Sequence, residues 1–263
     1  MDRRTFAQSL GGAAILSGFA ATSGWAQTPA TVAPGRIMAI AAHPGDALFT
    51  MGATVAQQIA RGGSGIFVSL SQGEKGAPKD IPVAQYGAMQ CAATDMAARL
   101  LGTTSVILDY PDAEIPYSEQ SVLRVCDVVR EHKPDVVITH WSGSWHRDHR
   151  ACHDIVRDAV FYADLNTLSR ARPPHTVSTT YYAENWEDAA DFVPDTYVDI
   201  ELVFEKWMRA CDFYPMWRGQ TGFFRYNDYY GSLAVMRGCV SRFKHAVALM
   251  SDQNQRTRRA QTL

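Results

Sequence analysis

Short apolar runs alternate with longer segments of helical periodicity along most of the chain, and this alternation is what most restricts its fold. The apolar runs, which predict buried strands, cover residues 37–42, 65–70, 105–108, 135–140, 177–182 and 197–200. The segments with helical periodicity cover residues 52–61, 84–101, 118–133, 148–164 and 201–214. Strands separated by helices of this length predict parallel β-α-β units. We therefore expect a single-domain α/β fold, with a Rossmann-like, mostly parallel sheet and helices on both faces.

Two histidine–aspartate clusters follow two of these predicted strands. Residues 43–46 read His-Pro-Gly-Asp after the first strand, and residues 146–149 read His-Arg-Asp-His after the fourth. The carboxyl ends of parallel strands meet at one edge of an open α/β sheet, where ligands bind. Two imidazoles and one carboxylate that meet there would form the three-ligand site, with an open position, that is typical of catalytic zinc. His153, four residues after His149, offers an alternative pair of ligands on one helical face.

The same clusters resemble the signature motifs of the PIG-L/LmbE-like family of zinc-dependent N-acetyl-sugar deacetylases. The first family motif is Ala-His-Pro-Asp-Asp, and residues 42–46 read Ala-His-Pro-Gly-Asp. The second is a His-Pro-Asp-His element, to which residues 146–149 are similar. The likeness spans roughly residues 37–214. It implies a hydrolase in which a metal-bound water is the nucleophile.

Carried over position by position, the resemblance implies a role for each histidine and aspartate of the two motifs. His43, Asp46 and His149 would be the metal ligands. His146 would stabilise or protonate the tetrahedral intermediate. Asp148 would orient a neighbouring imidazole, as the outer carboxylates of metal sites do. The implied cofactor is Zn²⁺, with another divalent metal as the alternative.

One position departs from the family motif, and it concerns the general base. In the family the first aspartate of the Asp-Asp pair takes the proton of the metal-bound water, whereas residue 45 is glycine here. Asp148, beside the ligands, and Glu74, in a Gly-flanked loop after the second strand, are candidate substitutes. His146 could also move the proton alone, because a bound metal lowers the pKa of water towards about 7. These three candidates stay open.

Substrate contacts are expected from polar and aromatic residues beyond the predicted strand ends. His140 ends the fourth strand and would hydrogen-bond substrate, with a structural role as the alternative. Glu184 and Asn185 follow the fifth strand and suit sugar hydroxyl groups, although a solvated loop would have the same composition. Trp217 and Arg218 belong to an aromatic-rich C-terminal third. Its rings suit the apolar faces of sugars, and core packing with a lid is the alternative.

The N-terminus is typical of an exported bacterial protein. Residues 2–26 combine the pair Arg3 and Arg4, a mildly apolar stretch, and Gly-Trp-Ala, a small-x-small cleavage site. These features resemble a twin-arginine export signal. We therefore expect a signal peptide at 1–26, a mature LmbE-like deacetylase domain at 27–263, and a periplasmic or secreted location.

Charge and hydropathy restrict the partners that the protein can have. The 263 residues carry a formal net charge of −2, which gives no electrostatic footprint for nucleic acid. No apolar run reaches the roughly 20 residues of a membrane-spanning helix. We expect a small-molecule or oligosaccharide substrate, and the oligomeric state stays open.

The function expected from the sequence is removal of an acyl group, most simply acetyl, from an amino sugar or glycoside. Two alternatives stand beside it. One is a catalytically silent metal- or carbohydrate-binding homologue, because residue 45 is glycine. The other is an esterase or another C–N hydrolase that uses the same metal site.

Overall fold

The predicted alternation of strands and helices is present in the computed structural model, which describes residues 34–187 and 190–253. The strands are β1 (Arg36–Ala41), β2 (Ser64–Ser71), β3 (Thr104–Tyr110), β4 (Val136–Thr139), β5 (Thr179–Ala183), β6 (Thr196–Asp199) and β7 (Ala246–Ser251). The α-helices are α1 (Pro44–Phe49), α2 (Gly52–Ala60), α3 (Val83–Leu101), α4 (Glu119–His132), α5 (Arg147–Asp164), α6 (Phe204–Cys211) and α7 (Tyr226–Ser241). Short 3-10 helices lie at Glu74–Gly76 and Pro215–Arg218.

The strands form one sheet in the order β3-β2-β1-β4-β5-β7-β6. β1 pairs in parallel with β2 and β4, so that Ala39 lies opposite Phe67 on one side and Ile138 on the other. β3 and β5 extend the parallel part, whereas β7 is antiparallel to both β5 and β6. The predicted mostly parallel α/β sheet is confirmed. The chain leaves β1 in one direction through β2 and β3, and returns to its other side at β4. The carboxyl ends of β1 and β4 therefore form the switch point at which open α/β sheets bind ligands.

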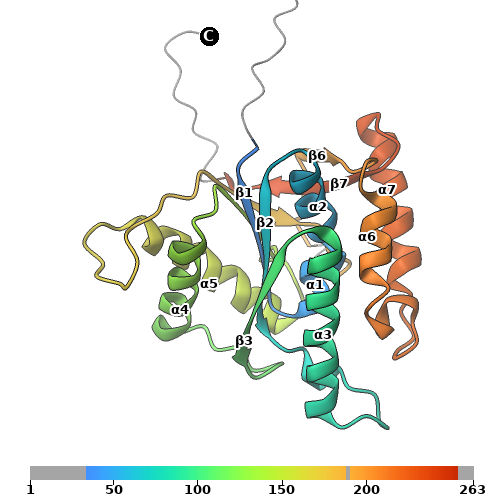
Figure 1. The fold of residues 1–263 in the computed structure, drawn as a ribbon, viewed down its shortest axis with the longest axis horizontal. Helices are drawn as coiled ribbons and strands as arrows, with labels where there is room; N and C mark the ends of the chain where they lie inside the picture. Colours follow the sequence, from blue (N-terminus) through green and yellow to red (C-terminus); the bar gives the residue numbers. More distant parts are fainter. Residues whose placement is uncertain (1–33, 188–189, 254–263) are drawn as a thin grey trace, which may run out of the picture. The chain divides into compact units, whose positions relative to one another are not determined.

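Helices cover both faces of this sheet, and Figure 1 shows α4 and α5 on one side with α1, α2, α3, α6 and α7 on the other. Alternate residues of β1 enter two different cores. Ala39 and Ala41 pack in the core beneath the larger group of helices. Met38 and Ile40 pack in the core beneath α4 and α5. Burial on both faces explains why the first predicted strand is a continuous apolar run instead of an alternating one.

Three elements were not expected from the sequence. α1 is a single short helix directly after the first His-Pro-Gly-Asp cluster. α7 escapes a periodicity search because apolar side chains occupy both its buried face, at Tyr230 and Ala234, and its exposed face, at Met236 and Val240. β7 is a short apolar run that reaches the sheet from the far end of the chain and separates β5 from β6.

Within residues 34–187 and 190–253, no helix is both long enough and apolar enough to cross a membrane. The signal peptide expected at 1–26, and the start of the mature domain expected at residue 27, lie outside the described residues.

Candidate active site

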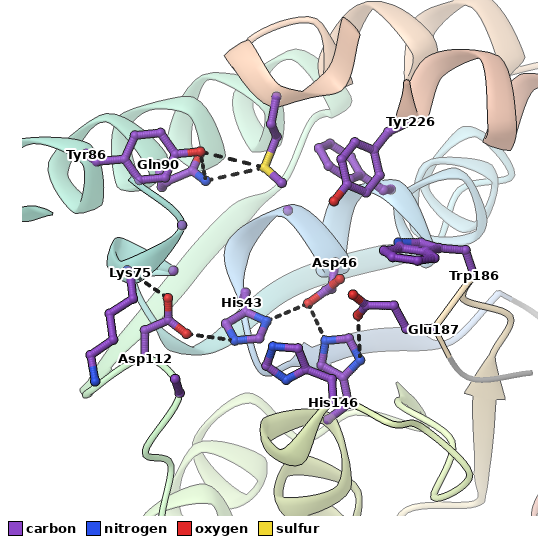
Figure 2. A pocket seen from close by; sticks show the side chains of 17 residues that line it. His43, Asp46, Lys75, Tyr86, Gln90, Asp112, His146, Trp186, Glu187 and Tyr226 are labelled. Atoms are coloured by element: carbon purple, nitrogen blue, oxygen red, sulfur yellow. Dashed lines mark hydrogen bonds and ion pairs between the residues drawn. The ribbon is translucent and has the colours of Figure 1, made fainter. Parts of the chain in front are cut away.

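The two histidine–aspartate clusters meet at the switch point between β1 and β4. His43 has extended backbone angles, φ −127° and ψ 155°, and caps α1, whose first residue is Pro44. Proline suits that place because its fixed φ is helical and its missing N–H would be unpaired there. His146 occupies the corresponding position before α5, where its side chain also accepts the Asp148 N–H. Both clusters therefore lie at helix starts just beyond neighbouring strands, as Figure 2 shows from close by.

The imidazoles of His43 and His149 converge on one carboxylate oxygen of Asp46. His43 Nδ1 lies 2.9 Å from Asp46 Oδ2, and His149 Nε2 lies 3.1 Å from the same oxygen. Together the three form a group of ligand atoms within 4.8 Å of one another that could hold a metal ion. A second such group, His43 with His146 and Asp148, shares His43. The first group is the better candidate because all three of its members line a cavity, whereas Asp148 is fully buried behind it.

The outer nitrogen of His43 faces two further carboxylates. His43 Nε2 lies 3.1 Å from Asp112 Oδ1 and 3.6 Å from Asp148 Oδ2. Asp112 is itself held in place, because its Oδ2 accepts the Lys75 backbone N–H at 2.8 Å. Burial works against a charged His43 ring, but these carboxylates and Asp46 outweigh it and raise the pKa of His43 well above its ordinary value.

This arrangement fits a divalent cation. A neutral imidazole carries one N–H, yet His43 has carboxylates at both ring nitrogens. A cation bound by His43 Nδ1 and Asp46 would leave no hydrogen on Nδ1. The single N–H of the neutral ring would then lie on Nε2, where it faces Asp112. Asp46 contacts imidazoles and an amide but, in the part of the chain described, no lysine or arginine side chain. The imidazoles outweigh the effect of burial and lower the pKa of Asp46 well below its ordinary value.

His149 is oriented from its other nitrogen. Its Nδ1 lies 3.3 Å from Ser144 Oγ and 3.4 Å from Glu187 Oε2. Its ring also stacks on His140, with centroids 3.9 Å apart and planes 15° apart. With Nδ1 engaged by oxygen atoms, Nε2 is the nitrogen that turns to Asp46.

His146 presents a hydrogen-bond donor to the same cavity. Its Nδ1 accepts the backbone N–H of Asp148 at 3.2 Å, so the hydrogen of the neutral ring lies on Nε2. Burial, together with the neighbouring His149 and His43, lowers the pKa of His146 to about 4. The ring is therefore neutral at pH 7, and its centroid lies 4.9 Å from that of His43 and 4.6 Å from that of His149.

The cavity beside the three candidate ligands has a volume of about 320 Å³. Ring side chains of Tyr86, Trp186 and Tyr226 line it, together with the backbone of Gly45. Its carboxylates are those of Asp46, Asp112 and Glu187, and Lys75 is its one lysine or arginine within the described residues. The site can therefore hold a cation and an uncharged ligand next to it.

Asn185, expected as a contact to sugar hydroxyls, lies at the site, where its side chain is buried and bonded to the protein. It is 4% exposed, and its Nδ2 donates to Asp46 Oδ1 at 3.4 Å. Its Oδ1 accepts the Tyr230 hydroxyl at 3.0 Å and the Glu187 backbone N–H at 3.4 Å. Burial thus assigns Asn185 to holding Asp46 in place.

The other expected substrate contacts do not line this cavity. His140 is 1% exposed, and its Nε2 accepts the backbone N–H of the residue before His43 at 3.1 Å. Glu184 turns outward to an ion pair with Arg237. Trp217 is fully buried in the core, with its ring centroid 4.6 Å from that of Phe49. Arg218 is exposed and pairs with Asp212 at 2.7 Å.

Of the candidates for the missing base, His146 lines the cavity, whereas Asp148 and Glu74 do not. Asp148 is 0% exposed, and its Oδ1 accepts the Ile115 backbone N–H at 3.3 Å. Glu74 Oε1 accepts the Asp112 backbone N–H at 2.9 Å, so this side chain supports the loop behind the cavity. As substitute bases, Asp148 and Glu74 are therefore poorly placed.

Sequence reasoning missed two carboxylates at the site. Asp112 follows β3, and a polar residue just beyond a parallel strand was the signal that could have found it. Glu187 belongs to the acidic run after β5 that was expected to recognise sugar hydroxyls, but only Glu184 and Asn185 of that run were singled out. His153, the alternative ligand on α5, lies outside the cavity, and its Nδ1 bonds to the backbone oxygen of His140 at 3.0 Å.

The sequence and fold are similar to those of known deacetylases and of a hydratase. Residues 38–160 match the family profile described as PIG-L: GlcNAc-PI de-N-acetylase. The diacetylchitobiose deacetylase of Thermococcus kodakarensis is 22% identical over 225 residues, which are 80% of this chain and 80% of that protein.

Two solved structures share the fold. The N,N'-diacetylchitobiose deacetylase of Pyrococcus horikoshii has a TM-score of 0.70 at 21% identity, over 82% of this chain and 83% of its own. The 4-carboxy-2-hydroxymuconate hydratase of Pseudomonas putida KT2440 has a TM-score of 0.78 at 20% identity, over 87% of this chain and 99% of its own. Hydration was not among the activities considered from the sequence. Residues 38–160, which hold both histidine–aspartate motifs, therefore match the PIG-L family profile that these motifs predicted.

Proposed function

We propose that the protein is a metal-dependent hydrolase that removes an acyl group, most simply acetyl, from the nitrogen of an amino sugar or its glycoside. The observation that carries this proposal is the convergence of His43, Asp46 and His149 beside a cavity with aromatic walls. The similarity to deacetylases of N-acetylated sugars supports the same reaction.

The ion would be held by His43 Nδ1, Asp46 Oδ2 and His149 Nε2. Zn²⁺ suits this set of two imidazole nitrogens and one carboxylate oxygen, with a position left open for the reaction. When bound, such an ion polarises the substrate carbonyl and makes water a good nucleophile at neutral pH. The chain's own residues supply the remaining chemistry.

His146 is placed to stabilise the negative charge that develops on the carbonyl oxygen. Its neutral ring offers the Nε2 hydrogen to the cavity, and the Asp148 N–H holds the ring in that tautomer. A donor that is already oriented costs no reorganisation when the charge appears. Asp148, through its carboxylate near His43 Nε2, would keep its expected role of orienting an imidazole.

The cavity favours an uncharged amide as substrate. Its volume of about 320 Å³ is at the lower end of the range for small-molecule sites, which suits one amino-sugar unit. Trp186 and Tyr226 offer ring faces for the apolar side of a sugar. Three carboxylates against one lysine would repel a substrate that carries several negative charges.

A second candidate function is the addition of water to a carbon–carbon double bond. The observations in its favour are the fold similarity to a hydratase and the lack of a side chain at Gly45. The hydratase's own name describes a carboxylate-bearing substrate. The excess of acidic groups in this cavity opposes such an anion, so the deacetylase remains the first proposal.

The test is turnover of a panel of N-acetylated and O-acetylated sugars by the Zn²⁺-loaded protein, with free amine and acetate measured separately. We expect equal amounts of amine and acetate from N-acetylated amino sugars, and loss of turnover when a chelator removes the metal. Acetate from O-acetylated sugars alone would favour the esterase. No product from any of them, with metal bound, would favour the binding protein or the hydratase.

Two histidines on α5 provide a matched pair of variants. His149→Ala removes one of the three candidate ligands and should lower both metal content and turnover sharply. His153→Ala, one helical turn further on, should retain both, because His153 lies outside the cavity. Equal metal loss from the two variants would contradict the assignment of His149.

We also propose that residues 1–26 direct twin-arginine export and are removed from the mature protein. The support is the sequence pattern around Arg3 and Arg4. Changing both arginines to lysine should leave uncleaved precursor in the cytoplasm, as detected by cell fractionation. Unchanged export of that variant would refute the proposal.

A further inference from the structure

Gly45 leaves the cavity wall without the carboxylate that the family motif carries at this position. It is the second residue of α1, and its backbone lines the cavity. A Cβ built there would lie 3.2 Å from Phe49 Cε2 and 3.6 Å from Met216 Sδ. Its φ is not in the left-handed region, so the backbone itself would accept another residue. The proton acceptor for hydrolysis must therefore come from elsewhere in the wall.

Three carboxylates line this cavity within the described residues, and each of them has contacts there. Asp46 belongs to the candidate metal group. Asp112 uses Oδ1 toward His43 and Oδ2 for the Lys75 backbone N–H. The third carboxylate is that of Glu187.

Glu187 is held at the site through its backbone. Its N–H donates to Asn185 Oδ1, and the same Asn185 side chain donates to Asp46 Oδ1. The Glu187 carbonyl oxygen accepts the Trp145 N–H at 3.3 Å, which links this loop to the one before α5. One buried amide therefore fixes the distance between the Glu187 loop and the candidate metal ligand Asp46.

The Glu187 side chain faces the reaction space. Figure 2 shows its carboxylate beside that of Asp46 and directed toward the imidazole next to His146. That imidazole belongs to His149, and its Nδ1 lies 3.4 Å from Glu187 Oε2. The Glu187 side chain is 13% exposed, and Trp186 and Tyr226 line the same cavity. A carboxylate in this position can reach a water molecule that approaches the candidate ligands.

We propose that Glu187 is the general base that replaces the carboxylate missing at residue 45. This inference rests on the proposed deacetylase function. As the oxygen of an incoming water bonds to the amide carbon, one water proton passes to the Glu187 carboxylate and the carbonyl oxygen gains the negative charge. When the C–N bond breaks, the carbonyl re-forms and the Glu187 proton passes to the amine nitrogen. The products are the carboxylic acid and the free amine, and Glu187 is again ionised.

The rival role for Glu187 is positioning of His149, and the two roles predict different results. A base affects the chemical step, so Glu187→Gln should lower kcat by about 10²–10⁴-fold with metal affinity and KM nearly unchanged. Loss of an outer carboxylate that orients a ligand would instead weaken metal affinity by about 10–100-fold. Glu184→Gln is the control, because this neighbouring carboxylate pairs with Arg237 outside the cavity.

Gly45→Asp provides a rescue experiment. In the Glu187→Gln background it restores a carboxylate to the same cavity, so kcat should recover at least about tenfold if the lost group was the base. Gly45→Ala in that background adds the Cβ next to Phe49 without a carboxylate and should not recover activity. Zn²⁺ affinity is measured for each variant by chelator competition, independently of turnover.

Several outcomes would overturn the proposal. Unchanged kcat in Glu187→Gln would exclude Glu187 as the base while leaving the deacetylase function intact. Weakened Zn²⁺ binding in Glu187→Gln, with no rescue by Gly45→Asp, would assign it to positioning. Absence of wild-type turnover would refute the proposed function and this inference together.

Discussion

Arg130 holds the C-terminal end of α5, the helix that begins at the second histidine–aspartate cluster. The loss of stability on its replacement can be worked out from the structure and measured. The side chain is 1% exposed and lies between α4 and α5. Its guanidinium donates to the backbone oxygens of Tyr162, Ala163, Leu165, Leu168 and Arg172, at 2.9 to 3.2 Å. A cation at the C-terminus of α5 also faces the negative end of the helix dipole.

The cost of Arg130→Met follows from which of these oxygens keep another donor. Three of the five also accept a backbone N–H, but Leu168 O and Arg172 O have no backbone donor within the described residues. A fully buried acceptor without a partner costs about 1–3 kcal/mol; because Leu168 is half-buried and Arg172 is exposed, about 2–6 kcal/mol is the upper range for the two. Burying a guanidinium also has a desolvation cost, which methionine avoids, so the net loss lies in the lower half of that range. We expect about 3 kcal/mol, or a fall in Tm of about 6–12 °C for a domain of this size.

The assay is urea unfolding followed by tryptophan fluorescence, with chelator present so that metal binding does not mask the change. Arg124→Met is the control on the same helix. That exposed side chain pairs with Asp109, and such pairs contribute about 0–1 kcal/mol. A loss below about 1 kcal/mol in Arg130→Met would show that water replaces the guanidinium at these oxygens, and would refute the reasoning.

Three further predictions concern the site and its surroundings. Asp112→Asn removes the charge facing His43 Nε2 and should weaken Zn²⁺ binding by about 10–100-fold in chelator competition; unchanged affinity would show that His43 does not depend on it. His146→Ala should lower kcat by about 10²–10³-fold with metal content retained, and unaltered kcat would remove it from the mechanism. Burial, although opposed by the bond to His140 O, lowers the pKa of His153, so the unfolded chain binds the proton more readily. The stability due to the neutral ring is therefore present above pH 6.5 and lost as the pH falls toward the lower pKa of the folded state. His153→Gln should reduce this loss in urea titrations at pH 7.5 and 5.5, and an identical pH dependence in both proteins would contradict the assignment.

The placement of the two histidine–aspartate clusters could be predicted because it depends on local pattern. An apolar run such as that of β1 predicts a strand, and the strand's carboxyl end fixes the edge of the sheet that the next residues occupy. His43 and Asp46 at one strand end, and His146 and His149 beyond another, must then approach the same crevice. Sequence alone therefore determined the parallel sheet and the residues that come together in it.

What the tertiary structure decided depends on contacts between residues far apart in the chain. β7 enters the sheet between β5 and β6, a pairing that no local pattern specifies. Asp112 and Glu187 come from loops after β3 and β5, and they join the site only because the first loop meets His43 at the start of α1 and the second meets His149 at the start of α5. Trp217 was expected to contact substrate but lies in the core. The sequence around a tryptophan does not show whether its ring lines a cavity or fills a core. Strand ends are fixed by local periodicity, whereas the direction and burial of a loop side chain depend on which distant elements pack around it.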